Sequence, residues 1–513
     1  MCSTDSTRSR WDRLALATLA SLGLAAAAPA QSISYEFDPA FNGNYSIDAF
    51  TTGENTGAER YGIRIVRLPD GDVVTAGLVR LDNDPVAPHW NVGLVRTSPG
   101  GVRQVWSGGG PYFHAGNQYV VYPNLPNGGS GIATIRKIAD FAYANGRLYV
   151  LVRSRFSVDP PDHDVQLLVF ADDGSFVNAI NVFNGPADEN AVALDLRETG
   201  LIASPVAIAV LGTVSGIRGA IAKYRVDASG VIQLDTSFGG GDGRIEFALP
   251  LAECDHPDCA LGVSDIAFPQ GNLVGSNLPL YVAGSVQRTS STSTDFDMAV
   301  LKFTGDGQLD PAFDENGVRQ YAFDLANSSL ADFARALVVR RSVVGGIDTV
   351  WMTGAVAGRC TQMAGVIRLA GSTGAPTTTF GPGSRVVFGS PQPSPGEPCG
   401  DPANLEPTGL ITIGEELVVG ATAFLPDSGA GAFTSGALAT LSAETGTLLS
   451  LDGLPLSDGG AVATRSRIDG LVAGEGDRRV YVSGSGAVGP YNSLFLTARL
   501  RPGDDTIFRN GFQ

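Results

Sequence analysis

The sequence contains few of the residues on which many enzymes and nucleic-acid-binding proteins depend. Its 513 residues include four histidines, four tryptophans and only three lysines, which are Lys137, Lys223 and Lys302. There are 52 acidic against 35 basic residues, so the formal net charge is −17. Such a charge repels phosphate backbones and anionic lipid headgroups. We therefore expect no nucleic-acid partner, and lysine-based catalysis has few candidates.

Long apolar runs are also scarce. The segment 14–28 is apolar over roughly fifteen residues, which is short for a membrane span, and no later stretch is long enough. A basic stretch precedes this segment, and the small residues Ala28-Pro29-Ala30 end it, as in a cleavable signal peptide. We therefore expect residues 1–30 to be a signal peptide and the protein to be exported, to the periplasm or the cell exterior, with no transmembrane segment.

Cysteine is equally sparse. Beyond the expected signal peptide the cysteines are Cys254, Cys259, Cys360 and Cys399. An even number in an exported chain predicts disulfides, between Cys254 and Cys259 and between Cys360 and Cys399. The spacing would also suit a metal ion, although paired C-x-x-C motifs are missing.

What the sequence does contain is a degenerate repeat, the mark of a modular fold. A short strand that ends in a small residue recurs seven times, at a period of roughly 68 residues. The copies are VVTAG (73–77), LYVLV (148–152), IAVLG (208–212), LYVAG (280–284), VWMTG (350–354), LVVG (417–420) and VYVSG (480–484).

Each copy belongs to a unit of four short strands. One apolar-alternating segment precedes the copy and another follows it, and a fourth element is clearest at 234–247 and 309–323. Four strands separated by turn signals are typical of a propeller blade. We therefore predict an all-β protein, a seven-bladed β-propeller of four-stranded antiparallel blades over residues 31–500, with a tail at 501–513. An open β-solenoid is the main alternative, although its repeats are usually shorter and more regular.

The ends of the repeat predict how the ring closes. The last unit supplies only three strands, whereas the segment FDPAFNGNYSIDAF (37–50) matches the fourth-strand element. Pairing of residues 44–50 with the last blade would give a 3+1 closure and remove two exposed sheet edges.

These residues resemble the bacterial delta-60 repeat, which is related to NHL-type propellers. The resemblance rests on LDTSFGGGDGRIEF (234–247), LYVAGS (280–285), DMAVLKFTGDG (297–307) and LDPAFDENGVRQYAF (309–323). It implies a propeller and an exported location, and it implies no particular activity. The tail DDTIFRNGF (504–512) resembles a short C-terminal motif of some exported bacterial proteins; the alternative is a plain disordered end.

The connections between strands predict which face of the ring is functional. With the strands of each blade named a to d from the centre outward, the a–b and c–d turns are mostly short, and the b–c and d–a connections carry the insertions. All four histidines and the four cysteines fall in these insertions, with His89 and His163 in b–c and His114 in d–a connections. Because rigid scaffolds usually present function on variable loops, we expect the b–c/d–a face to be the functional one.

One constellation on that face is a candidate metal site. It combines three histidines with five aspartates, which are His89, His114, His163, Asp82, Asp84, Asp159, Asp162 and Asp164. Imidazole and carboxylate groups bind zinc and other divalent ions, and a histidine–aspartate pair can act as a general base. The alternative is a set of polar loop residues that solvate the face. No cofactor other than a divalent metal is indicated, and no catalytic residue is assigned.

Two functions remain open. The first is an exported, monomeric and non-enzymatic binding module that takes a protein, a glycan or another surface ligand on the b–c/d–a face. The alternative is a secreted propeller hydrolase or lyase, with or without a metal ion, whose site lies on the same face. No G-x-S-x-G elbow is present, and a fold alone does not decide between the two.

Overall fold

The description of the fold comes from a computed structural model. The chain divides into Met1–Ser32 and Ile33–Gln513, and all described residues belong to the second unit. No helix in the described part of the chain is long and apolar enough to cross a membrane. The described residues are 35–48, 60–80, 90–122, 134–158, 161–185, 188–198, 206–214, 218–227, 229–248, 261–271, 277–287, 295–325, 331–342, 346–390, 403–425, 433–454, 457–458, 461–462, 465–474, 478–487 and 493–503.

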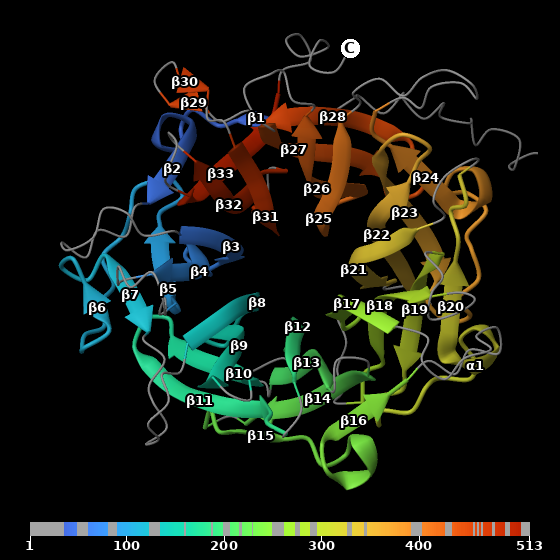
Figure 1. Ribbon diagram of the computed structural model, residues 1–513, viewed down its shortest axis with the longest axis horizontal. Helices are drawn as coiled ribbons and strands as arrows, with labels where there is room; N and C mark the ends of the chain where they lie inside the picture. The colour runs from blue at the N-terminus through green and yellow to red at the C-terminus, as the bar shows by residue number, and fades with distance from the viewer. Residues whose placement is uncertain are drawn as a thin grey trace, which may run out of the picture. The chain divides into compact units, whose positions relative to one another are not determined.

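Seven antiparallel blades follow one another in chain order around a central axis, which confirms the predicted seven-bladed β-propeller (Figure 1). Blade one contains β3 (Arg60–Arg67), β4 (Val73–Arg80), β5 (Trp90–Thr97) and β7 (Tyr119–Tyr122), with β6 (Phe113–His114) outside β7. Blade two contains β8 (Thr134–Ala144), β9 (Arg147–Val158), β10 (Pro161–Ala171) and β11 (Phe176–Phe183). Blade three contains β12 (Asn190–Glu198), β13 (Val206–Val214), β14 (Arg218–Val226), β15 (Ile232–Leu234) and β16 (Arg244–Phe247).

The remaining blades repeat this plan. Blade four contains β17 (Leu261–Ala267), β18 (Leu280–Gln287), β19 (Phe296–Phe303) and β20 (Val318–Tyr321). Blade five contains β21 (Asp332–Arg341), β22 (Asp348–Ala357), β23 (Gln362–Ala370) and β24 (Arg385–Phe388). Blade six contains β25 (Asn404–Ile413), β26 (Glu416–Leu425), β27 (Phe433–Ser442) and β28 (Leu448–Leu454). Blade seven contains β31 (Arg465–Ala473), β32 (Val480–Ala487) and β33 (Ser493–Pro502), and a hairpin of β29 (Ser457–Asp458) and β30 (Ala461–Val462) precedes it.

The predicted 3+1 closure is present. Strand β2 (Tyr45–Asp48) pairs antiparallel with β33, with Tyr45 opposite Ala498 and Ser46 opposite Thr497. Strand β1 (Tyr35–Phe37) continues along the same edge. The N-terminal part of the described chain therefore supplies the outer strand of blade seven, and the first and last strands lie side by side (Figure 1).

The repeat is visible in the sequence because the second strand of each blade is buried. In β18 all eight residues are buried, and successive side chains from Leu280 to Ala283 enter the cores on opposite faces of the blade in turn. The helices are single turns, η1 (Asn42–Asn44), η2 (Gly239–Gly241), α1 (Asp314–Gly317) and η3 (Pro382–Ser384), each just before the outer strand of a blade.

Three of these single turns, η1, η2 and α1, belong to a recurrent Asp-x-x-Phe turn, which explains the fourth-strand element of the sequence. The phenylalanine N–H donates to the aspartate carbonyl, the ring is fully buried, and a basic residue of the third strand pairs with the aspartate carboxylate. The three sets are Asp38, Phe41 and Arg499 at 2.8 Å, Asp235, Phe238 and Lys223 at 3.4 Å, and Asp310, Phe313 and Lys302 at 2.8 Å. In each set the cation also lies over the phenylalanine ring.

Candidate functional site

Three carboxylates converge at the junction of blades two and three. Asp162 and Asp164 stand two residues apart at the start of β10, so both side chains extend from the same side of the strand. Glu189 ends the connection from β11 to β12. Carboxylate oxygens of these three residues, the carboxylate cluster, lie within 4.8 Å of one another. The cluster therefore lies where a b–c and a d–a connection meet, on the face predicted to be functional.

The backbone around Glu189 is held in place by neighbouring groups. Its N–H donates to the carbonyl of His163 at 3.1 Å, and its own carbonyl accepts from Arg153 Nε at 2.9 Å. Glu189 Oε1 accepts the N–H of Gly185 at 3.0 Å. The glutamate is thus fixed against β10 before any ligand arrives, which lowers the entropy cost of binding one.

Two oxygens of the carboxylate cluster are buried without a hydrogen-bond partner. These are Glu189 Oε2 and Asp162 Oδ1, and the Glu189 residue is only 2% exposed. Burial, with the charge of Asp162, raises the pKa of Asp164 to about 6. Burial also raises the pKa of Glu189 to about 7, and the charges of Asp164 and Asp162 add to this effect. Three converging acidic groups, of which two have a buried oxygen without a donor in the described part of the chain, are costly to enclose, and a cation would offset that cost.

The size and chemistry of the cluster suit a hard divalent ion. Calcium binds carboxylate oxygens at about 2.4 Å, so that oxygens on opposite sides of the ion lie about 4.8 Å apart. A set made only of oxygen ligands favours calcium or magnesium over zinc, which prefers nitrogen and sulfur.

A second carboxylate triad occupies the corresponding place two blades further on. Asp295 and Asp297 stand at the start of β19, Asp324 follows β20, and their oxygens also lie within 4.8 Å of one another. Each triad thus combines a D-x-D pair before the third strand with a carboxylate from the following d–a connection. The sequence signal is DHDV at 162–165 and DFDM at 295–298, and its repetition would have drawn attention to both places.

The structure places His163 and His114, two of the three grouped histidines, in different kinds of connection. His163 lies next to the carboxylate cluster, where its Nδ1 contacts Asp188 Oδ1 at 2.8 Å. Burial and the charge of Arg153 hold the pKa of His163 below its ordinary value, against the opposing charge of Asp188. His114 lies on β6, between the third and fourth strands of blade one, and hence in a c–d connection instead of the predicted d–a connection. The cause is an insertion after β5 that forms an outer hairpin with β7.

Several predicted residues lie outside the described residues. They are His89, Asp82, Asp84, Asp159, Cys254, Cys259 and Cys399. Cys360 lies between β22 and β23, and its pairing with Cys399 stays a prediction. Sequence reasoning missed Glu189 and Asp188, because their relation to β10 depends on how blade three packs against blade two.

The opposite face of the ring carries a cavity between blades five and six. It has a volume of about 350 Å³, and we call it the arginine cavity. Its walls come from a–b turns, c–d turns and strand ends, with the lining residues Arg340, Arg341, Ser342, Thr349, Trp351, Arg368, Glu415, Ala443 and Glu444.

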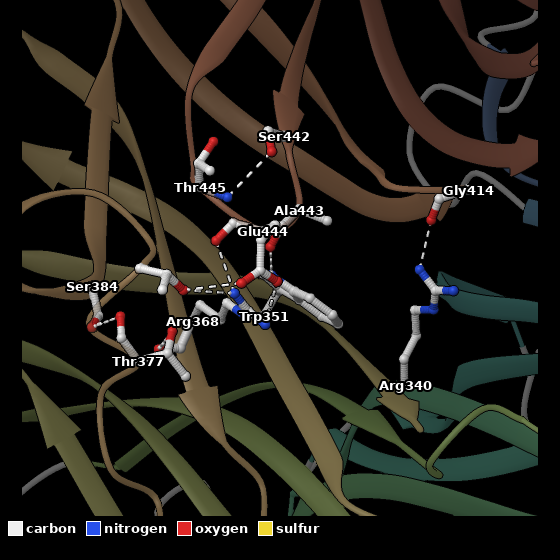
Figure 2. A network of polar contacts seen from close by, with 11 residues as sticks. Arg340, Trp351, Arg368, Thr377, Ser384, Gly414, Ser442, Ala443, Glu444 and Thr445 are labelled. Atoms are coloured by element: carbon white, nitrogen blue, oxygen red, sulfur yellow. Dashed lines mark hydrogen bonds and ion pairs between the residues drawn. The ribbon is translucent and has the colours of Figure 1, made fainter. Parts of the chain in front are cut away.

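One wall of the arginine cavity is an interlocked group of side chains (Figure 2). Arg368 Nη2 pairs with Glu444 Oε2 at 2.9 Å, and its guanidinium lies 5.6 Å from the centre of the Trp351 ring. Trp351 Nε1 donates to the carbonyl of Ala443 at 3.1 Å. Hydrogen bonds from Arg368 and Trp351 therefore join blade five to the c–d turn of blade six.

The sequence of blade five explains why Arg368 reaches the neighbouring blade. Arg368 stands opposite Trp351 in the strand pairing, as Lys302 stands opposite Tyr281 and Arg499 opposite Tyr481. In blade five, however, Thr377 takes the place of the aspartate of the Asp-x-x-Phe turn, and its phenylalanine is Phe380. Since its own blade offers no carboxylate there, Arg368 pairs with Glu444, whose side chain is 60% exposed.

Comparisons with known proteins add little to this description. No family model matches the chain, and no curated protein matches it. The polysaccharide lyase Uly1 aligns with 86% of this chain and 90% of its own, at 10% identity and a TM-score of 0.40. The Dos1 propeller covers 87% of this chain and 93% of its own, at 10% identity and a TM-score of 0.38. The α-L-arabinofuranosidase Arb93A from Fusarium graminearum covers 92% and 97%, at 11% identity and a TM-score of 0.36. The fold therefore rests on the strand pairing, and the resemblance to delta-60 repeats stays a prediction.

Proposed function

We propose that this protein is an exported binding module in which a calcium ion, held by the carboxylate cluster, takes part in holding a ligand on the b–c/d–a face. The observation that carries the proposal is Glu189, a carboxylate that is 2% exposed and has an unpartnered oxygen within a group of three converging acids. Most buried polar groups in proteins form hydrogen bonds, so a buried carboxylate oxygen without a hydrogen bond indicates a bound ligand.

The chemistry of the ion suggests the class of ligand. Calcium takes about six to eight oxygen ligands, and three carboxylates leave several positions for water or for oxygens of the ligand. Hydroxyl and carboxylate oxygens of a glycan, or carboxylates and carbonyls of a protein surface, fill such positions. A rigid ring with a preformed ion site supports this binding without any catalytic group.

Calorimetry on the purified protein tests the proposal. After EDTA treatment and removal of the chelator, calcium is titrated into the wild type and into the isosteric variants Asp164→Asn and Glu189→Gln. We expect saturable binding to the wild type and at least a tenfold loss of affinity in each variant. Glu246→Gln is the matched control, because Glu246 is 58% exposed and its contact with Arg218 is long, at 3.8 Å. A wild-type protein that takes up no calcium at millimolar concentration would contradict the proposal.

A second candidate is a hydrolase or lyase at the same place, and the contact between His163 and Asp188 favours it. An aspartate on Nδ1 orients the imidazole so that Nε2 is available as a general base. Under this function, His163→Gln removes turnover of a polysaccharide substrate and leaves calcium affinity unchanged. Under the binding function, the same variant shows no change in any measured activity, because there is none.

A further inference from the structure

The arginine cavity is a second candidate binding site, on the face away from the carboxylate cluster. Its volume of about 350 Å³ lies at the lower end of the range for small-molecule sites, roughly 300–1,000 Å³. We propose that it binds a small hydroxylated carboxylate, such as a sugar acid, with the carboxylate on Arg340 and the hydroxyl groups on the acidic rim. This inference is independent of the calcium site.

Arg340 is the residue that points to an anion. Its Nη1 donates to the carbonyl of Gly414 at 2.6 Å, which fixes the guanidinium between blades five and six (Figure 2). Within the described part of the chain, no carboxylate oxygen lies within 4 Å of it. A guanidinium has five N–H donors in a planar fork that matches a carboxylate. Arg340 therefore offers a positioned fork whose charge the neighbouring residues do not neutralise.

The other two arginines of the cavity hold the site in shape. Arg341 Nε pairs with Asp348 Oδ1 at 3.0 Å, and Arg368 pairs with Glu444 at 2.9 Å. Arg340 is therefore the one arginine of the cavity lining without an ion-pair partner among the described residues, in a protein whose net charge is −17. In the other three Asp-x-x-Phe turns an aspartate accompanies the third-strand cation, whereas here Thr377 leaves the neighbourhood one carboxylate short.

The rest of the lining points to hydroxyl groups on the ligand. Glu415 is exposed at the rim, and the Glu444 side chain is 60% exposed. Carboxylates only accept hydrogen bonds, so these groups select a ligand that donates, and Thr349 can do both. With acetate as the ligand, only water would contact the rim carboxylates of Glu415 and Glu444. A sugar acid can bind the Arg340 guanidinium with its carboxylate and the rim carboxylates with its hydroxyl groups.

Calorimetry with sodium glucuronate as the probe tests the inference. The titration is made at low ionic strength with EDTA present, so that calcium bound at the carboxylate cluster does not contribute. We expect saturable binding of glucuronate, and binding at least about tenfold weaker for its neutral methyl ester and for acetate, because hydrogen bonds to a charged group are the strong ones. Failure of glucuronate to bind, or equal affinity for the ester, would overturn the proposal.

Variants of Arg340 separate recognition from folding. Arg340→Gln removes the charge and is expected to weaken glucuronate binding at least about tenfold. Arg340→Lys keeps the charge and loses the planar fork, so a loss is expected there too. Arg218→Gln is the control, since its side chain is 59% exposed and lies on blade three. Wild-type affinity in both Arg340 variants would overturn the assignment of the ligand carboxylate to Arg340, and unchanged melting temperatures would show that both variants are folded.

Discussion

Asp140 and Leu194 join the innermost strands of blades two and three, since Asp140 Oδ2 accepts the N–H of Leu194 at 2.9 Å. The same arrangement continues around the ring. Asp195 Oδ2 accepts from Phe268 at 2.6 Å, and Asp265 Oδ2 accepts from Leu337 at 2.8 Å. In blades two, three and four, one aspartate side chain of the innermost strand thus forms a hydrogen bond with the next blade. These contacts lie near the central axis, where neighbouring blades are closest.

Removal of one of these carboxylates should loosen the ring. In Asp140→Ala the N–H groups of Leu194 and Phe141 lose their acceptor, and the ion pair between Arg64 and Asp140 at 3.2 Å is lost. We expect a loss of about 1–3 kcal/mol in the free energy of unfolding, measured by chemical denaturation. Asp242→Ala is the control, because that carboxylate is exposed and accepts only a local N–H, from Arg244. Equal stability of the Asp140 variant and the wild type would refute a tying role.

The same carboxyls predict how stability changes with pH. Burial raises the pKa of Asp265 to about 8 and that of Asp195 to about 7. The folded protein therefore holds protons that the unfolded chain gives up near pH 4, so stability is greatest below that pH with respect to these groups and falls as the pH rises toward 8. In Asp265→Asn the decline of the melting temperature between pH 5 and 8 should be shallower than in the wild type. A parallel decline would exclude Asp265 as a contributor.

Protons and calcium should compete at the carboxylate cluster. The pKa values of Asp164 and Glu189, about 6 and about 7, are raised, so both groups bind protons in the range where calcium needs them ionised. Calcium affinity should fall steeply from pH 8 to pH 5, with protons released on binding at pH 6.5. Calorimetry in two buffers of different ionisation enthalpy measures that release. Affinity that is constant over this range would place the ion elsewhere.

Neutralising the cluster should also stabilise the protein without calcium. Asp164→Asn removes one of three converging acids and with it the repulsion of Asp164 by Asp162 and Glu189, so the melting temperature in EDTA should rise. In the wild type, calcium should raise the melting temperature, and in the variant that rise should be absent. A variant less stable than the wild type in EDTA would show that Asp164 serves the fold instead of a ligand.

The ring closure can be tested with two ion pairs on the same strand. Asp38 and Arg499 are buried, at 3% and 6% exposure, and lie 2.8 Å apart. Asp38→Asn should cost about 3–5 kcal/mol, because it leaves a buried guanidinium without its counter-charge. Glu36→Gln breaks the contact with Arg501, whose side chain is 44% exposed, and should cost less than about 1 kcal/mol. Similar losses in both variants would contradict a special role for Asp38 in closure.

The fold could be predicted because its determinants are local and repeated. The second strand, LYVAG in blade four, is buried on both sides, and an Asp-x-x-Phe turn precedes the outer strand of blades three, four and seven. The fourth-strand element at 37–50 therefore predicted pairing with the last blade, which the pairing of β2 with β33 confirms.

The candidate sites could be predicted only in part, because they depend on contacts between blades. Asp162 and Asp164 were recognised among the histidines and aspartates of the b–c and d–a connections, whereas Glu189 joins them only because Arg153 and His163 hold its backbone against β10. The outer hairpin of blade one moved His114 away from His163. The arginine cavity depends on Thr377, which stands where the other three turns have an aspartate. This difference can be recognised only when the four turns are compared.

Blade seven contains strands from both ends of the described chain, and this delays its completion during synthesis. Residues 45–48 leave the ribosome early, yet their partner strand is made some 450 residues later, so the segment remains unpaired while six blades form behind it. Contacts between such distant residues are slow to form, because a long loop must close first. We expect the nascent chain to form an incomplete ring in which β2 is unpaired and accessible to proteases. The ring then closes in one final, cooperative step when β33 has been made.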